Sequence, residues 1–171
     1  MTPIGALMRG VWPVRTAISL LWARITRADR APVPAVSTIE EAAALCRELS
    51  IAYRADPVID YSEHPERVEF YRLRGQLARL PGLDCDDLAF YASVCLRRIA
   101  TVARVVVLVD ETGRYAHAVC EAWVGGRRWV LDTNGLAELA PATPVHLRFA
   151  ALYPDARYVE EFVVPYPFVG Q

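Results

Sequence analysis

The sequence predicts an α+β domain in which helices come first along the chain and an antiparallel sheet follows. Before residue 100, apolar residues recur at helical spacing, whereas from Val102 onward the chain is rich in β-branched residues. Gly125 and Gly126 separate two of the later apolar runs, which is typical of a two-residue hairpin turn. A series of helices followed by a series of strands indicates the α+β class.

Size and composition indicate one folded domain with a short appendage. A chain of 171 residues buries one sizeable core but leaves little room for a second. Hydrophobic residues make up 54% of the chain and charged residues 23%, which is a globular rather than a disordered composition. The formal net charge is −1, so the chain lacks the basic excess of nucleic-acid-binding proteins, and we expect no nucleic-acid partner.

Residues 1–35 are expected to form an N-terminal arm with a linker, and residues 36–171 the main domain. Residues 17–27 predict a short amphipathic helix with one apolar face, formed by Ile18, Leu21, Trp22 and Ile25. Two prolines within residues 31–36 predict an extended linker. The arm has three interpretations: packing on its own domain, docking of residues 1–30 to a protein partner, and, least favoured, adsorption to a membrane surface.

The arm does not match a membrane-spanning helix or a secretory signal. Prolines and arginines interrupt its apolar stretches before the roughly 18 to 20 apolar residues that a spanning helix needs. Its arginines lie inside and after the apolar stretch, whereas a signal peptide carries its basic residues in front. We therefore favour a cytoplasmic location, and leave open export or association with a larger assembly such as a virion.

Three helices are predicted before the sheet. Ser37 and Glu40 have the spacing of a capping box, and helical periodicity follows over about residues 38–54. Residues 65–80 predict a second helix, which an internal glycine weakens. A third helix is expected to begin within one or two residues of Cys85, because a buried helical stripe follows: Leu88, Tyr91, Ala92, Cys95, Leu96 and Ile99.

The predicted sheet occupies the second half of the chain. Residues 102–110 are apolar and β-branched, which predicts a buried strand. Residues 117–124 and 127–132 flank the two glycines and predict a hairpin. Two further strands are expected over residues 145–152 and 158–164, with the proline-rich C-terminal residues as an edge or tail.

A cysteine at the start of a helix is a candidate nucleophile. Cys85 is predicted to lie at a helix N-terminus, where the helix dipole and the free amides of the first turn favour the thiolate. The same amides can stabilise an oxyanion when sulfur attacks a carbonyl. Asp84 suits the N-cap position, but the negative charges of Asp84, Asp86 and Asp87 oppose a thiolate unless they are paired or a histidinium balances them.

The hairpin turn predicts that a histidine and a carboxylate meet. If the two glycines form the turn, Val124 pairs with Arg127, and the same register sets Asp132 opposite Val119. His117 then lies diagonal to Asp132 on one face of the sheet, with Cα atoms about 7 to 8 Å apart, which is within reach of a hydrogen bond. A carboxylate in that position fixes the tautomer of a catalytic histidine.

Each of these residues also has an ordinary interpretation. Cys85 can be a small buried side chain, His117 a histidine at a strand end, and Asp132 the cap of the turn that follows. The competing bases are His64, in a proline-flanked loop, and His146, in a predicted strand, and neither has a carboxylate at a comparable cross-strand position. Taken together, the three residues favour a catalytic set of nucleophile, base and orienting carboxylate.

The sequence predicts no metal site and no cofactor. The four cysteines, Cys46, Cys85, Cys95 and Cys120, form no C-x-x-C pair and have no histidine at zinc-site spacing. Three of the four lie within apolar patterns, so we expect buried free thiols, while the even number leaves disulfides open. The chain contains no calcium-binding loop pattern and no motif for an organic cofactor.

The ordered motifs resemble those of a known superfamily. The sequence DCDD at residues 84–87, an apolar strand, HAVCEAW at 117–123 and WVLD at 129–132 together resemble the transglutaminase-like superfamily, and within it the bacterial transglutaminase-like cysteine proteinases. The resemblance covers roughly residues 37–134. The family usually has glycine directly before the first aspartate, where this chain has Leu83 with Gly82 one place earlier.

The resemblance implies a papain-like α+β core for residues 36–171 and a thiol-dependent site. By this resemblance Cys85 is the nucleophile, His117 the general base and Asp132 the third member, acting through a thioester acyl-enzyme. The family's upstream oxyanion donor has no clear counterpart; Gln76 lies within range in the sequence, with Asp84 as a supporting residue, and Gln76 is equally well a solvated helix residue.

Three functions fit these expectations. The first is a thiol hydrolase of peptide or other amide bonds, with a peptide or protein substrate, because water is the default acceptor of the acyl group. The second is an acyltransferase that crosslinks proteins by transferring the acyl group to an amine. The third is a structural or docking component of a larger assembly, such as a phage tail or a secretion machine, with the N-terminal arm as its attachment.

Overall fold

The computed structural model describes residues 31–54, 65–80, 82–112, 116–155 and 157–163. The predicted amphipathic helix of the arm and His64 lie outside the described residues. Residues 31–36 contain no helix or strand, and Val36 at their end is buried in the core of the domain.

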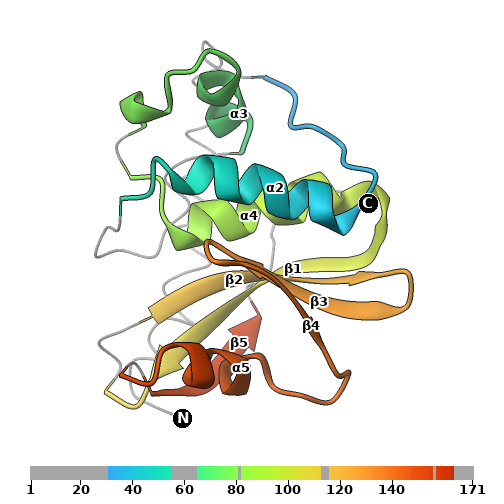
Figure 1. Ribbon diagram of the computed structural model, residues 1–171, viewed down its shortest axis with the longest axis vertical. Helices are drawn as coiled ribbons and strands as arrows, with labels where there is room; N and C mark the ends of the chain where they lie inside the picture. Colours follow the sequence, from blue (N-terminus) through green and yellow to red (C-terminus); the bar gives the residue numbers. More distant parts are fainter. Residues whose placement is uncertain (1–30, 55–64, 81, 113–115, 156, 164–171) are drawn as a thin grey trace.

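The fold is α+β, as predicted, with helices packed on a five-stranded antiparallel sheet (Figure 1). The helices are α2 (Ile39–Ser50), α3 (Pro65–Leu73), α4 (Cys85–Cys95) and α5 (Val145–Leu152), with short 3₁₀ helices at Leu77–Arg79 and Leu96–Arg98. The strands are β1 (Ala100–Asp110), β2 (Ala116–Val124), β3 (Arg127–Asp132), β4 (Gly135–Leu139) and β5 (Tyr158–Val163), in the spatial order β4-β3-β2-β1-β5.

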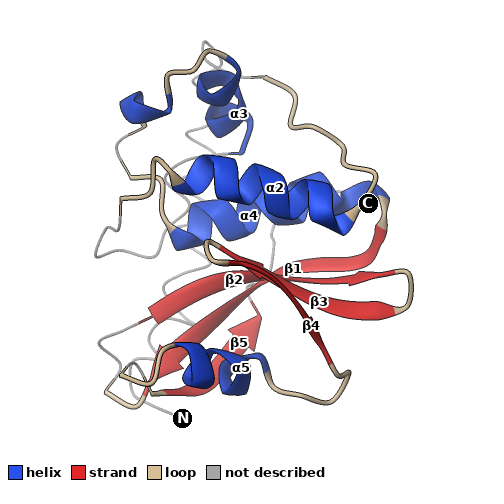
Figure 2. Ribbon diagram, in the orientation of Figure 1, coloured by secondary structure: helices blue, strands red, loops and turns tan. Residues whose placement is uncertain are grey.

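Helices cover both faces of the sheet, α2 and α4 on one and α5 on the other (Figure 2). Helix α4 is buried on almost all sides because it lies between the sheet and helices α2 and α3. The α4 side of the sheet contributes Val105, Val107, Ala118, Cys120 and Leu131 to the larger core. The α5 side holds a smaller apolar cluster that includes Val106, Leu108, Val119, Val130 and Phe149.

Helix α2 forms where predicted, with its cap one residue later. The Thr38 side chain accepts a hydrogen bond from the Glu41 amide at 3.2 Å, and the Glu41 carboxylate accepts one from the Ser37 amide at 2.7 Å. The pair predicted from the sequence, Ser37 and Glu40, has the same spacing. The helix ends at Ser50 rather than near residue 54, and Tyr53 follows it in a loop.

The predicted helix over residues 65–80 is interrupted. Helix α3 ends at Leu73, and Gly75 then adopts a φ of +62°, a conformation that glycine tolerates and helices exclude. A short 3₁₀ helix, Leu77–Arg79, occupies the remainder. The glycine that weakened the pattern therefore ends the helix.

The hairpin between β2 and β3 has the predicted register. Val124 pairs with Arg127 and Cys120 with Leu131, and no bulge intervenes. Gly125 and Gly126 have φ values of +61° and +77°, which match the left-handed conformations of a type I′ turn.

The prediction of a strand over residues 145–152 is wrong, because this segment is helix α5. The run VHLRF alternates like a strand, but Val145 and Phe149 are four residues apart and both are buried, whereas Leu147 is exposed. Residues four apart lie on the same face of a helix, so a helix can bury both Val145 and Phe149. Strand β4, which was not predicted, is short and begins at Gly135, so its sequence carries little periodicity. Strand β5 agrees with the strand predicted from residue 158.

All four cysteines are buried and free. The described part of the chain contains no helix long and apolar enough to cross a membrane.

A buried ion network ties the hairpin to α5. The Glu121 carboxylate is almost fully buried and accepts hydrogen bonds from Arg104 and from Arg128, the latter at 2.6 Å. The Arg128 guanidinium also donates to backbone carbonyls of the segment that leads into α5, those of Ala140, Pro141 and Thr143. Arg128 thereby fixes the start of α5 relative to the sheet.

Replacing Arg128 with methionine is expected to lower the free energy of unfolding by about 3 kcal/mol, because the buried Glu121 carboxylate loses a charged partner. Urea unfolding followed by circular dichroism measures the loss. Arg127→Met is the matched control: Arg127 is exposed and pairs with the exposed Glu138, so a much smaller loss is expected. Equal losses in the two variants would contradict a structural role for the buried network.

Candidate active site

The first turn of α4 presents Cys85 as its first residue, as predicted. Asp84 is the N-cap, and its carboxylate accepts a hydrogen bond from the Asp86 amide at 3.2 Å. The Asp87 carboxylate reaches back to the Asp84 amide, which completes a capping box. These bonds fix the direction in which the chain enters the helix and hence the position of the Cys85 side chain.

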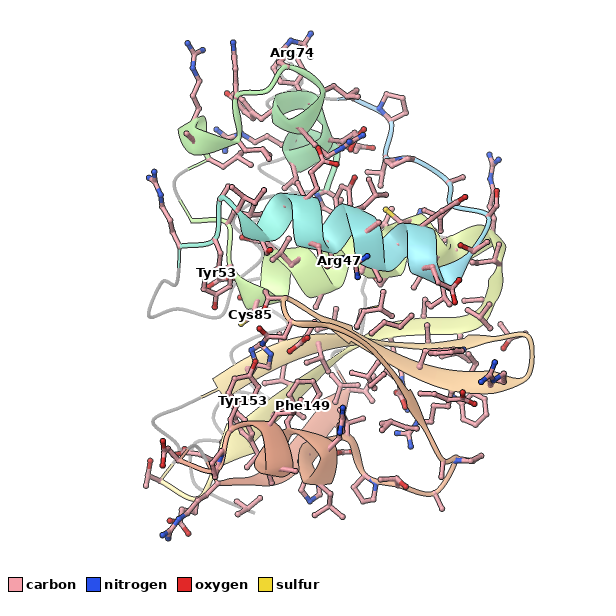
Figure 3. All side chains as sticks on the ribbon, in the orientation of Figure 1. Arg47, Tyr53, Arg74, Cys85, Phe149 and Tyr153 are labelled. Carbon is pink, nitrogen blue, oxygen red and sulfur yellow. The ribbon has the colours of Figure 1, made fainter. Side chains whose placement is uncertain are left out.

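The Cys85 thiol lies between helix α4 and strand β2. Only 8% of the residue is exposed, and its hydrogen bonds within the described structure are with the Tyr53 side chain and the Ala118 backbone. Ala118 follows His117 on strand β2, so the thiol lies beside the histidine's own backbone. In Figure 3, Cys85 lies between Tyr53 on one side and Tyr153 on the other.

The surroundings of Cys85 favour the neutral thiol. Burial raises the pKa of the thiol well above its ordinary value, and the carboxylates of Asp86 and Asp84 raise it further. The hydrogen bonds from Ala118 and Tyr53 act in the opposite direction but do not cancel the rise. As the sequence indicated, the neighbouring carboxylates therefore disfavour the thiolate form of Cys85. The effect of the helix dipole, which alone would favour the thiolate, does not prevail.

Asp86 is itself held in an unfavourable environment. It is 2% exposed, and its Oδ1 has no hydrogen-bond partner among the described residues. Burial raises the pKa of this carboxyl, and so do its contact with Asp84 and the charges of Asp87 and Asp84. The start of α4 thus concentrates buried acidic groups beside the thiol.

His117 and Asp132 meet across the hairpin, as the register predicted. The distance from His117 Nε2 to Asp132 Oδ2 is 3.4 Å, and the side chains are 12% and 5% exposed. Because Nε2 faces the carboxylate, Nδ1 is the ring nitrogen that Asp132 leaves open to other contacts. Of the three predicted catalytic residues, His117 and Asp132 are therefore in direct contact. Cys85 contacts the backbone of Ala118, the residue that follows His117.

Asp132 is held in place by the turn that follows strand β3. Its Oδ1 accepts hydrogen bonds from the amides of Asn134, at 2.8 Å, and Gly135, at 3.0 Å. Its Oδ2 lies 3.5 Å from the Tyr153 hydroxyl. The ordinary interpretation of Asp132 as a turn cap is therefore correct as well, and the same bonds orient the oxygen that faces His117.

Two aromatic residues that no sequence pattern indicated pack on the histidine ring. The centroid of His117 lies 5.5 Å from that of Phe149 and 5.9 Å from that of Tyr153, and the Phe149 and Tyr153 rings are nearly parallel. Phe149 lies in α5 and Tyr153 directly after it, so assigning that segment to a strand hid them. Tyr53 falls at the end of the helix predicted over residues 38–54, and no local pattern signals its contact with Cys85.

The remaining candidates lie elsewhere or have other contacts. Gln76 lies between α3 and the following 3₁₀ helix, and its amide donates to the Tyr71 carbonyl; its role as an oxyanion donor stays a prediction. His146 lies in α5 rather than in a strand, and its Nδ1 is 2.9 Å from Glu161, so this histidine does have a carboxylate partner, on strand β5.

The start of α4 also offers ligand atoms for a metal ion. Asp84, Cys85 and Asp86 each place one such atom within 4.8 Å of the other two. All three residues are buried and adjacent in the chain, so the helix cap alone accounts for their proximity, and we assign no metal to them.

No protein-family model, no curated protein and no solved structure matches this chain. The functional interpretation therefore depends on the geometry of the site itself.

We expect iodoacetamide to label Cys85 slowly at pH 7, at a rate that keeps rising with pH through the ordinary thiol range of about 8.5 to 9, because burial and the neighbouring carboxylates keep the thiol protonated. Mass spectrometry identifies the labelled cysteine. Asp86→Asn removes one charge that raises the thiol pKa and should accelerate labelling at fixed pH, whereas Asp155→Asn, at an exposed position, should not. A rate plateau near neutral pH that disappears in His117→Ala would instead indicate a preformed thiolate–imidazolium pair.

Asp86→Asn should also stabilise the fold at neutral pH. The folded state raises the pKa of Asp86 above its ordinary 3.8, so its contribution to stability is fully present below pH 3.8 and is lost as pH rises through the folded pKa. Asparagine does not ionise, so the variant should have a higher free energy of unfolding than the wild-type protein at pH 7. Thermal unfolding between pH 4 and pH 8 measures the difference, which should shrink toward pH 4. A variant that is less stable at every pH would count against this interpretation.

Proposed function

We propose that this protein is a cysteine-dependent hydrolase of peptide or other amide bonds, with Cys85 as nucleophile, His117 as general base and Asp132 as the residue that orients the histidine. The observation that carries the proposal is the contact of His117 Nε2 with Asp132 on a strand whose next residue, Ala118, hydrogen-bonds Cys85. A nucleophile, a base beside it and a third group that fixes the base form the minimal arrangement for acyl transfer by a thiol.

In the proposed first step, His117 removes the thiol proton during attack rather than before it. The raised pKa of Cys85 favours this order, because the free protein holds a neutral thiol. As the sulfur bonds to the substrate carbonyl carbon, His117 Nδ1 accepts its proton and Asp132 stabilises the imidazolium. The C–N bond then breaks, His117 returns the proton to the departing amine, and a thioester remains on Cys85.

Water completes the cycle in the second step. The water molecule gives a proton to His117 as its oxygen bonds to the thioester carbon, the C–S bond breaks, and the proton returns to the sulfur. The Ala118 amide and the Tyr53 hydroxyl are candidate donors to the transient oxyanion, since both already contact the sulfur. Burial and the Cys85 sulfur raise the Tyr53 pKa, so its hydroxyl keeps the proton that it donates.

The resemblance to the transglutaminase-like superfamily supports the same proposal. The DCDD sequence places Cys85 at the N-terminus of α4, and strands β2 and β3 carry His117 and Asp132. We infer from this resemblance that the α+β domain is a papain-like or transglutaminase-like core. Such a core also allows an amine to replace water, which would make the protein a crosslinking acyltransferase.

The burial of Cys85 favours one alternative from another class. A thiol that is 8% exposed and protonated by its surroundings is also what a structural or docking component would hold, if it kept the fold inside a larger assembly. Acylation of the thiol distinguishes the two functions.

p-Nitrophenyl acetate, a generic activated acyl donor, should acetylate Cys85, and mass spectrometry should find the acetyl group on that residue. His117→Ala should slow acetylation by about 10²- to 10⁴-fold, the usual loss when a general base is removed, and Cys85→Ala should abolish it. Asp132→Asn should slow it while circular dichroism shows an unchanged fold.

His146→Ala is the matched control, because His146 pairs with Glu161 and should leave the rate unchanged. Transfer of the acyl group to an added primary amine in preference to water would indicate crosslinking. No acetylation of Cys85 above that of the three other buried thiols would favour the structural component.

A further inference from the structure

A small pocket lies on the side of Asp132 that faces α5. It encloses about 120 Å³ between strand β4 and helix α5. Leu136 and Leu152 supply apolar wall, Asn134 and Asp132 supply polar atoms, and Arg148 brings a guanidinium. An apolar wall with a few placed polar groups is the ordinary composition of a site for a side chain or small ligand.

The pocket is lined by one guanidinium and one carboxylate, and they differ in their partners. Arg148 is exposed and has no ion pair or side-chain hydrogen bond with any other residue that the structure describes. The only carboxylate in the lining is Asp132, and its oxygens already face the amides of Asn134 and Gly135 and the His117 ring. The group that remains available to a ligand is therefore the guanidinium, which binds carboxylates in a bidentate manner.

The pocket shares two lining residues with the surroundings of His117. Asp132 lines the pocket and contacts His117, and Phe149 lines the pocket and packs on the His117 ring. An extended peptide advances about 3.3 to 3.6 Å per residue, so a chain held at Cys85 can place a neighbouring side chain beyond His117.

We propose that this pocket binds the carboxylate-bearing side chain of a glutamate or aspartate in the peptide on which Cys85 acts. The methylene groups of that side chain pack against Leu136 and Leu152, and its carboxylate pairs with Arg148. The assignment of the pocket to a substrate rests on the proposed function, whereas its preference for a carboxylate rests on Arg148 and the lining alone.

Binding to the Cys85→Ala variant tests the pocket without thiol chemistry. The probes are acetylated hexapeptide amides of glycine and serine that carry one glutamate, moved through each position in turn, with glutamine at the same position for comparison. Chemical shifts of the backbone amides of Asn134, Gly135 and Ala137 report binding at the pocket in an NMR titration.

At the best position, the glutamate peptide should bind about fivefold more tightly than the glutamine peptide, as expected for a partly exposed ion pair. Arg148→Gln should abolish this difference, and Arg148→Glu should favour a lysine peptide instead. Arg79→Gln, at an exposed arginine outside the pocket, should keep the preference.

Equal binding of glutamate and glutamine peptides, or a preference that survives Arg148→Gln, would overturn the proposal whatever the reactivity of Cys85. If the carboxylate preference holds while p-nitrophenyl acetate leaves Cys85 unmodified, the pocket stands and the hydrolase function fails. The peptide titration and the acetylation of Cys85 thus test the carboxylate pocket and the hydrolase function independently.

Discussion

The packing of α4 on strands β1 and β2 is the constraint on which the candidate site depends. Helix α4 lies between the sheet and two other helices, and its N-terminal residue contacts the backbone of β2. Because the core around it is closely packed, neither the helix nor the strand can shift without losing buried apolar contacts. The hairpin then brings Asp132 to His117, so the relative positions of all three residues follow from one helix–sheet interface and one turn.

Electrostatics at the same interface determines which chemistry the thiol can perform. The capping box that positions Cys85 is built from carboxylates, and these carboxylates also raise the thiol pKa. A helix start therefore does not by itself make a cysteine reactive, since burial and neighbouring charge outweigh the dipole here. The proposed mechanism, in which His117 acts only as attack proceeds, is the form of catalysis that this environment permits.

Features that depend on local spacing could be predicted from the sequence, and features that depend on contacts between distant elements could not. The start of α4, the hairpin register and the His117–Asp132 contact all follow from residue types at short separations. Helix α5 was misassigned because its first five residues alternate like a strand, and packing on the other face of the sheet selects the helix. Tyr53 reaches Cys85 from a loop after α2, which no periodicity reveals.

The position of α5 between β4 and β5 separates the proposed catalytic residues from the proposed substrate pocket within the chain. The eight residues Val145–Leu152 carry Arg148 and Phe149, which packs on the His117 ring, but none of the three proposed acyl-transfer residues. Arg128 holds one end of this segment through backbone carbonyls, and Glu161 accepts from the His146 amide at the same end. The exposed face of α5 is thus free to vary without disturbing its anchors, and exchanging that face is a route by which one scaffold can acquire new substrates while the sheet and α4 stay the same.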